Sequence, residues 1–245
     1  IYVKNINLPS NVYDFIVRKL DIGDIVGLEG EVFYTKTEEL SIKASNITLL
    51  AKSIRPLPNL KEKDGKTFFS FDDKELRYRN RHLDLIANKE VQEVFINRAR
   101  IISNMRKFLD NSGYLEVETP ILQPQYGGAN ARPFKTFHNT LEEELFLRIA
   151  DELYLKRLII GGINNVYEIS KNFRNEGMDK NHNPEFTMLE FYSAYSDVYD
   201  MMDFTENMIR DIANNMTVSH SIDFSKAFKR FSYFDILYEV TKINF

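Results

Sequence analysis

The residues best suited to chemistry lie in one stretch, 166–195, where polar and apolar side chains alternate. Neighbouring side chains on a β-strand point to opposite faces. A first strand therefore places an entirely polar set on one face: Glu168, Ser170, Asn172, Arg174 and Glu176. A second strand places Phe186, Met188, Glu190 and Tyr192 on one side. Carboxylates, an arginine, an aromatic ring and a phenol can thus converge.

These residue types have a coherent chemical use. The planar guanidinium of Arg174 can hold a phosphate or carboxylate and stabilise a pentavalent phosphorus. The ring of Phe186 can stack on a purine, and Glu176 can accept a hydrogen bond from an exocyclic amine. Glu190, with Glu152 from a predicted helix, forms an anionic pocket for a cationic substrate end. An exposed hairpin alternates in the same way, so the pattern alone favours a solvated face over a ligand site.

Predicted helices and strands surround this stretch. Apolar residues recur at helical spacing over residues 90–111, and Gly113 supplies a left-handed cap. The further predictions are helices over 151–160 and 198–214, a strand over 145–148, and a hairpin of strands 166–174 and 186–195. Alternation over residues 23–50, around a turn at 35–39, predicts a small β domain that suits a barrel better than a flat sheet.

The composition excludes several classes of site. The 245 residues, 43% of them hydrophobic, suffice for one large domain or two modest ones. The absence of cysteine removes disulfides, thiolate zinc sites and cysteine nucleophiles, and favours a reducing compartment. The four histidines (82, 138, 182 and 220) are too scattered for a metal cluster, and no glycine-rich phosphate loop is present.

The charge balance limits how a nucleic acid could bind. The net charge is −4, so a nucleic-acid partner must be held locally. Residues 55–81 hold eight basic and five acidic side chains, a modest positive excess in a Pro-containing stretch that reads as a linker. No apolar run reaches the roughly 18 residues that a membrane span needs, and we expect a cytoplasmic protein. The chain begins at Ile1 on a strand-like pattern, which predicts a fragment of a longer protein.

Several segments, in a consistent order, resemble class II aminoacyl-tRNA synthetases, specifically the lysyl-tRNA synthetases. FRNEG at 173–177 with HNPEFTMLEFYSAY at 182–195 resembles motif 2, and NSGYLEVETPIL at 111–122 resembles motif 1, the dimer-forming element. GGANARPFKTFHN at 127–139 resembles the amino-acid loop of the family, and LRIADELYLKRLIIGG at 147–162 resembles its lysine-pocket helix. RYRNRHLDL at 77–85 resembles the hinge, and residues 23–42 resemble later strands of the anticodon-binding OB barrel.

The resemblance implies an α+β fold in three parts. Residues 1–55 correspond to a partial N-terminal OB-fold β-barrel, residues 56–85 to a linker or hinge, and residues 86–245 to the N-terminal part of the catalytic domain, an incomplete antiparallel sheet flanked by helices. The family forms homodimers through the motif 1 region, here residues 90–122. Motif 3 and the first barrel strands are absent from the sequence.

The resemblance also implies the activity: ATP-dependent attachment of lysine to tRNA(Lys) through a lysyl-adenylate, with this piece inactive alone. Arg174 is the implied catalytic residue, at the α-phosphate of ATP. The other implied ATP-binding residues are Glu176, His182, Asn183 and Phe186, and the lysine-binding residues are Gly128, Glu152, Glu190 and Tyr192. Mg²⁺ is the implied metal, with ligands expected beyond Phe245.

Three alternatives remain. An aspartyl or asparaginyl synthetase is disfavoured because Glu152 and Glu190 would repel an acidic side chain. A lysyltransferase that modifies a translation factor is disfavoured by residues 1–55, since the forms known lack the N-terminal barrel. Retention of Arg174, Glu176 and Phe186 speaks against a synthetase-like binding protein that has lost catalysis.

Overall fold

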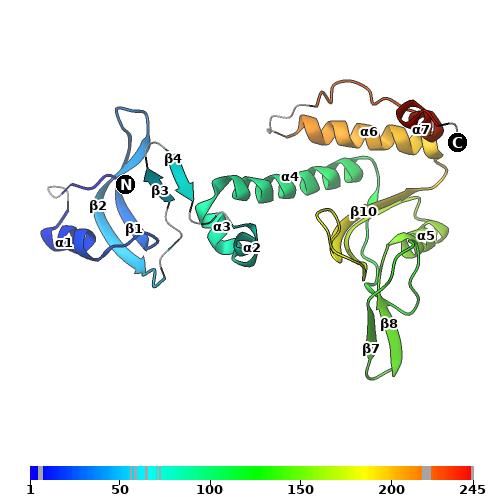
Figure 1. Cartoon of the computed structure of the whole chain (residues 1–245), viewed down its shortest axis with the longest axis horizontal. Coiled ribbons are helices and arrows are strands. Elements are labelled where there is room, and N and C mark those ends of the chain that lie inside the picture. Colours follow the sequence, from blue (N-terminus) through cyan, green and yellow to red (C-terminus); the bar gives the residue numbers. More distant parts are fainter. Residues whose placement is uncertain are drawn as a thin grey trace. The chain divides into compact units, whose positions relative to one another are not determined.

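A computed structural model describes residues 1–4, 8–55, 57, 60–63, 66–69, 71, 73–216 and 222–243. His220 and several residues of the predicted linker, including Pro56, Pro58 and Gly65, lie outside the described residues. The chain divides into two compact units, Ile1–Phe95 and Ile96–Phe245 (Figure 1). Each unit is described by itself.

The first unit is built on a long antiparallel hairpin. Its strands are β1 (Ile25–Tyr34) and β2 (Leu40–Ala51), preceded by helix α1 (Ser10–Lys19). A register shift falls at Glu29/Gly30, where a side chain on Gly30 would approach the carbonyl oxygen of Lys43 to 2.2 Å. Only glycine therefore permits this close approach of the strands. One face of the hairpin and α1 share a small core built on Leu8, Ala44 and Ile47.

The segment that the sequence suggested as a linker contains regular structure. Strands β3 (Leu60–Lys63) and β4 (Lys66–Phe69) form a short hairpin, followed by helices α2 (Lys74–Arg79) and α3 (Arg81–Ala87). Asp84 organises the helices, because its buried carboxylate pairs with Arg77 at 2.7 Å and with Arg81. Burial alone would raise the pKa of Asp84, but hydrogen bonds from Asn88 and Arg77 lower it below its usual value.

The second unit contains two three-stranded sheets and the remaining helices (Figure 1). Its first sheet has the order β10–β9–β5, from β5 (Leu115–Glu116), β9 (Asn165–Phe173) and β10 (Glu185–Ser193). The second has the order β6–β8–β7, from β6 (Leu122–Gln123), β7 (Lys135–His138) and β8 (Glu143–Leu147). The helices are α4 (Lys89–Asn111), which begins before the boundary, α5 (Glu152–Ile160), α6 (Val198–Asn214) and α7 (Tyr233–Thr241).

The core of the second unit fixes which face of β9 and β10 is left for chemistry. Leu109 of α4, Tyr167 of β9 and Met208 of α6 belong to one buried cluster, against which Ile169, Leu189 and Phe191 also pack. The apolar face of the β9–β10 hairpin is therefore covered by α4 and α6. The opposite face carries the polar residues that the alternation predicted.

The structure confirms the mixed α+β class with antiparallel sheets and helices. The predicted helix 198–214 is α6, and the predicted hairpin is β9 and β10, with bounds that differ by one or two residues. Within the described residues, β1 pairs with β2 and β3 with β4, and these two sheets do not join into a closed barrel. None of the helices that the structure describes is long and apolar enough to span a bilayer.

Candidate active site

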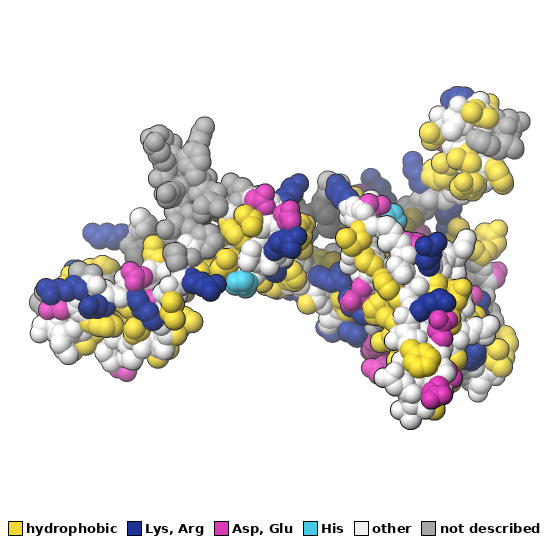
Figure 2. Space-filling model, turned by 60° about the horizontal axis from the view of Figure 1, so that its bottom comes forward, with side chains coloured by type: hydrophobic (Ala, Val, Ile, Leu, Met, Phe, Trp, Pro, Cys, Tyr) yellow, Lys and Arg dark blue, Asp and Glu magenta, His cyan; other side chains and the backbone are white. Residues whose placement is uncertain are grey.

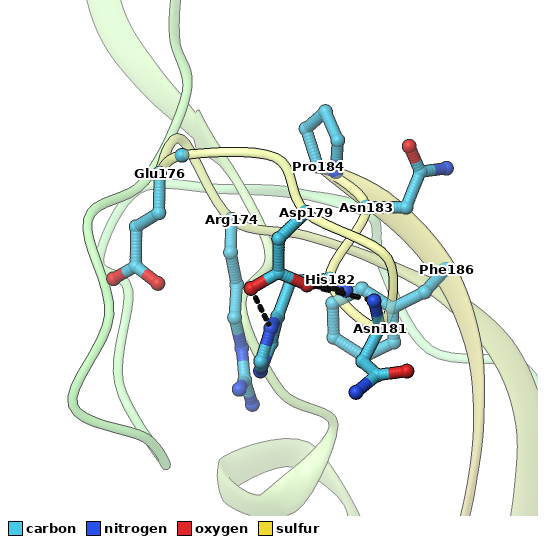
Figure 3. A pocket seen from close by; sticks show the side chains of 9 residues that line it. Arg174, Glu176, Asp179, Asn181, His182, Asn183, Pro184 and Phe186 are labelled. Carbon is cyan, nitrogen blue, oxygen red and sulfur yellow. Dashed lines mark hydrogen bonds and ion pairs between the residues drawn. The ribbon is translucent and has the colours of Figure 1, made fainter.

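A pocket of about 500 Å³ lies at the connection between β9 and β10. All five residues that the sequence predicted for ATP line it: Arg174, Glu176, His182, Asn183 and Phe186. Gly177, Asp179, Asn181 and Pro184 complete the lining (Figure 3). The register places Phe186 opposite Asn172, so the two predicted polar faces do share one side of the hairpin.

Arg174 and Phe186 form a preassembled pair in this pocket. The guanidinium carbon of Arg174 lies 5.1 Å from the centroid of the Phe186 ring. The Nε atom of Arg174 is buried and has no hydrogen-bond partner among the residues that the structure describes. A buried donor without a partner is costly. The pair therefore offers a positive charge, an unused donor and an aromatic face to a ligand.

A tight turn presents His182 to the same pocket. One carboxylate oxygen of Asp179 accepts hydrogen bonds from the backbone N–H groups of Asn181, at 2.7 Å, and His182, at 2.8 Å. The other lies 2.7 Å from Nδ1 of His182 (Figure 3). The backbone bond from Asn181 and the contact with His182 lower the pKa of Asp179. Sequence reasoning missed Asp179, although an aspartate two or three residues before the residues that it caps is a recognisable turn signal.

Glu176 and Asn183 are both engaged with the backbone. Oε1 of Glu176 accepts the N–H of Arg132 at 3.2 Å, which ties the β9–β10 connection to the loop before β7. The Asn183 side chain donates to the carbonyl oxygen of Glu185 at 2.7 Å and points away from Arg174 in Figure 3. Asn183 thus lines the pocket while its amide braces the start of β10.

The four residues predicted to hold lysine form a second cluster further along β10. Tyr192 donates to Oε2 of Glu190 at 3.1 Å, and the N–H of Asp151 donates to Oε1 at 3.2 Å. A side chain on Gly128, whose φ is +86°, would come within 2.9 Å of the Glu152 Cβ atom. Burial raises the pKa of Glu190, and the charges of Asp151 and Glu152 raise it further. A raised carboxyl pKa of this kind is typical of several carboxylates that lie close together and are partly shielded from water.

A cation of the chain itself already sits beside this cluster. The ammonium of Lys156 lies 2.5 Å from Oε1 of Glu152 and 5.9 Å from the centroid of the Tyr192 ring. A carboxylate together with an aromatic ring is an environment that suits an alkylammonium ion. Sequence reasoning missed Lys156, although its spacing of four residues from Glu152 on a predicted helix is a signal for such a pair.

The polar face of β9 is not open to a ligand along its whole length. Glu168, Ser170 and Asn172 are buried and bonded inside the protein. Arg148 donates to Glu168 at 2.7 Å, and Ser170 donates to Asp151 at 2.6 Å. The alternation predicted the face on which these three residues lie, but not that this part of the face is buried. The buried part supports the site, and the ligand-accessible part lies at Arg174 and along β10.

The part of the chain that the structure describes contains no group of three or more His, Cys, Asp or Glu side chains placed to hold a metal ion.

Comparisons with known proteins identify the family of the chain. The family described as tRNA synthetases class II (D, K and N) matches residues 73–243. A Fusobacterium nucleatum protein named Lysine--tRNA ligase is 48% identical over 100% of this chain and 50% of its own length. Proteins of the same name from Azobacteroides pseudotrichonymphae and Coxiella burnetii are 48% and 51% identical over 97% of this chain and 49% and 47% of their own lengths.

The chain spans about half the length of the curated relatives it matches. The family match includes the hinge-like segment, α4, both sheets of the second unit and the pocket between β9 and β10. The chain therefore belongs to the class II tRNA synthetases of the D, K and N group.

Proposed function

We propose that the protein containing this chain attaches lysine to tRNA(Lys) through a lysyl-adenylate. The observation that carries the proposal is the pairing of two sites on β10. Arg174 lies over the Phe186 ring at one end. At the other end Tyr192 is bonded to Glu190, and Glu152 pairs with the ammonium of Lys156. Phe186 and Glu190 are four residues apart on the same face, roughly 13 Å at the usual rise of a strand. The name of the chain's relatives, Lysine--tRNA ligase, supports the same assignment.

The proposed chemistry needs no protein nucleophile. The lysine carboxylate attacks the α-phosphorus of ATP, the bond to the β-phosphate breaks, and pyrophosphate leaves. A terminal hydroxyl of tRNA then attacks the carbonyl carbon, and AMP leaves. Arg174 acts by neutralising charge that develops on the α-phosphate and by orienting the carboxylate. Phe186 stacks on adenine, Glu176 accepts from its amine, and His182 and Asn183 lie over the phosphates.

Selection of lysine follows from the acidic cluster. Glu152 and Glu190 attract an ammonium and repel the carboxylate of aspartate. A neutral asparagine side chain would leave the partly buried carboxylate of Glu190 without an ionic partner, which costs more than the loss of an ordinary surface contact. Within the D, K and N group, the charges of this pocket thus favour lysine. Gly128 lets the backbone approach the amino end of the substrate.

The rest of the chain has proposed roles consistent with this activity. Residues 1–55 form part of an OB-fold anticodon-binding domain, supported by the bulged hairpin of β1 and β2. Residues 56–85 form the hinge and residues 86–245 the catalytic part, which dimerises through residues 90–122. ATP is a substrate, Mg²⁺ is bound by residues outside this chain, and the protein is cytoplasmic.

The test is amino-acid-dependent exchange of pyrophosphate into ATP by the full-length protein. We expect exchange with lysine and none above background with aspartate or asparagine. Exchange with either of the latter, or none with lysine, would contradict the proposal. The 245-residue chain assayed alone should show no exchange, because motif 3 is not part of it, and measurable exchange by that piece would refute this expectation.

A further inference from the structure

We propose that Asp151 is a positioning residue for the amino-acid pocket, one that fixes Glu190 through its own backbone N–H. The inference rests on the proposed function, because it concerns the residue expected to bind the substrate ammonium. Asp151 itself is completely buried and does not reach that ligand. It acts by holding a neighbouring group in place.

The side chain of Asp151 is turned away from its ordinary use. Asp151 occupies the N-cap position of α5, where an aspartate usually accepts hydrogen bonds from the first turn of its helix. Here the carboxylate makes no such bond. Its Oδ2 atom instead accepts the Ser170 hydroxyl of β9 at 2.6 Å and the Asn172 amide at 3.3 Å. The side chain thus cross-links the start of α5 to the sheet.

The anchored main chain then holds the pocket residue. The N–H of Asp151 donates to Oε1 of Glu190 at 3.2 Å, while Tyr192 donates to Oε2 at 3.1 Å. Both oxygens of Glu190 are thereby oriented from either side. The peptide that carries this N–H also leads directly into Glu152. One buried carboxylate therefore sets the placement of both acidic residues proposed to hold lysine.

The arrangement is costly, which argues for a role beyond stability. Burial raises the pKa of Asp151, and its Oδ1 accepts no hydrogen bond from the described residues. Arg148 Nε lies 3.2 Å from that oxygen but donates to the carbonyl of Lys171. The same guanidinium also pairs with Glu168. Asp151 and Glu168, both buried, thus share the single positive charge of Arg148. The excess negative charge of these three residues complements a cation bound in the neighbouring pocket.

The test compares three variants in the full-length protein, read by lysine-dependent pyrophosphate exchange. Asp151→Asn keeps the side-chain size but weakens the link to Arg148 and Ser170. Ser170→Ala removes the 2.6 Å bond to Asp151 together with the weaker 3.3 Å bond that the Asn172 amide donates to the Ser170 hydroxyl. Ser193→Ala is the matched control, because it removes a hydroxyl bond of 2.7 Å to Asn165 at the far end of the same two strands.

We expect Asp151→Asn to raise KM for lysine about tenfold and Ser170→Ala about threefold, with KM for ATP changed less than about twofold in both. Ser193→Ala should leave both constants near their wild-type values. Equal changes for lysine and ATP, or Ser170→Ala indistinguishable from Ser193→Ala, would overturn the positioning role. If Asp151→Asn does not fold, Ser170→Ala decides alone.

The wild-type protein separates the two claims. Wild-type exchange with lysine, without the KM split in the variants, would refute the role of Asp151 and leave the proposed function standing. Absence of lysine-dependent exchange in the wild type would overturn both.

Discussion

Arg174 illustrates how a single side chain can be prepared for a ligand. Its guanidinium lies over the Phe186 ring, and its buried Nε lacks a partner within the described part of the chain. A lysine at this position would keep the charge but lose the planar fork and the stacking. The planar shape of the Arg174 guanidinium, and not its charge alone, therefore matters in this pocket.

We predict that Arg174→Ala in the full-length protein abolishes adenylate formation, and that Arg174→Lys lowers it by about 10²–10³-fold. The thermal midpoint should stay unchanged, because the side chain lies at an open pocket. Arg157→Ala is the matched control, since Arg157 stacks on Tyr154 at 4.6 Å on the exposed side of α5. Normal exchange by Arg174→Ala would refute its catalytic role.

The acidic cluster predicts proton release on lysine binding. Burial and neighbouring negative charges raise the pKa of Glu190 in the empty pocket, and burial raises that of Asp151. A bound ammonium favours the ionised carboxylates and lowers both pKa values. Lysine affinity should therefore weaken as the pH falls through the raised pKa of Glu190, and binding should release protons.

Calorimetry in two buffers of different ionisation enthalpy measures this proton release in the full-length protein. The Glu190→Gln variant should release fewer protons on lysine binding, and its affinity for lysine should fall far more than its affinity for ATP. Proton uptake on lysine binding would contradict the charge assignment. An equal loss of affinity for lysine and ATP in Glu190→Gln would show that the lysine pocket is misassigned.

At the scale of elements, the sequence predicted what periodicity controls. Helix α6 and the β9–β10 hairpin follow from spacing, since their apolar stripes must face one core. Helices α2 and α3 were missed because the prolines, glycine and charges of residues 56–85 suggested a linker. Their order depends on Asp84, whose ion pairs with Arg77 and Arg81 are tertiary information that no local pattern carries.

The same distinction explains the site. The five residues predicted to bind ATP were identified by a long motif, and the structure brings them together in one pocket. Asp151 and Lys156 were missed because their roles arise only when α5 is placed against β9 and β10. The buried state of Ser170 and Asn172 was likewise unforeseen, because alternation assigns a face but does not say what covers it.

Helix α6 carries a prediction of its own. Asp197 caps the helix, because its carboxylate accepts hydrogen bonds from the backbone N–H groups of Tyr199 at 2.7 Å and Asp200 at 3.0 Å. The Asp200 carboxylate in turn accepts a hydrogen bond from the backbone N–H of Asp197. Asp197→Ala should lower the free energy of unfolding by about 1 kcal/mol, measured by urea titration. Asp211→Ala is the control, because an acid near the C-terminus opposes the helix dipole and its loss should cost nothing. Equal destabilisation by both variants would contradict the capping role.

At the scale of the whole molecule, charge is distributed and not concentrated. The net charge is −4, and on the face shown in Figure 2 the described Lys and Arg side chains are interspersed with acidic and hydrophobic ones. An RNA partner of such a surface is held by local groups of basic residues.

The two compact units should unfold as two transitions, because each has its own buried cluster. Asp24 provides the test in the first unit. Its carboxylate accepts the N–H groups of Asp21 and Ser53 and pairs with Lys52 at 2.7 Å, and the backbone bond from Asp21 leads these contacts in lowering its pKa to about 2. The ordinary value is 3.8, so this stabilisation is complete above pH 3.8 and is lost as the pH falls through about 2.

Asp24→Asn should therefore lower the midpoint of one calorimetric transition of the chain at neutral pH, and its difference from the wild type should vanish as the pH approaches about 2. Asp197→Ala should lower the other midpoint alone, since α6 belongs to the second unit. These assignments are reciprocal, so each variant serves as the control for the other. A shift of both midpoints by either substitution, or a single transition for the whole chain, would show that the two units do not unfold independently.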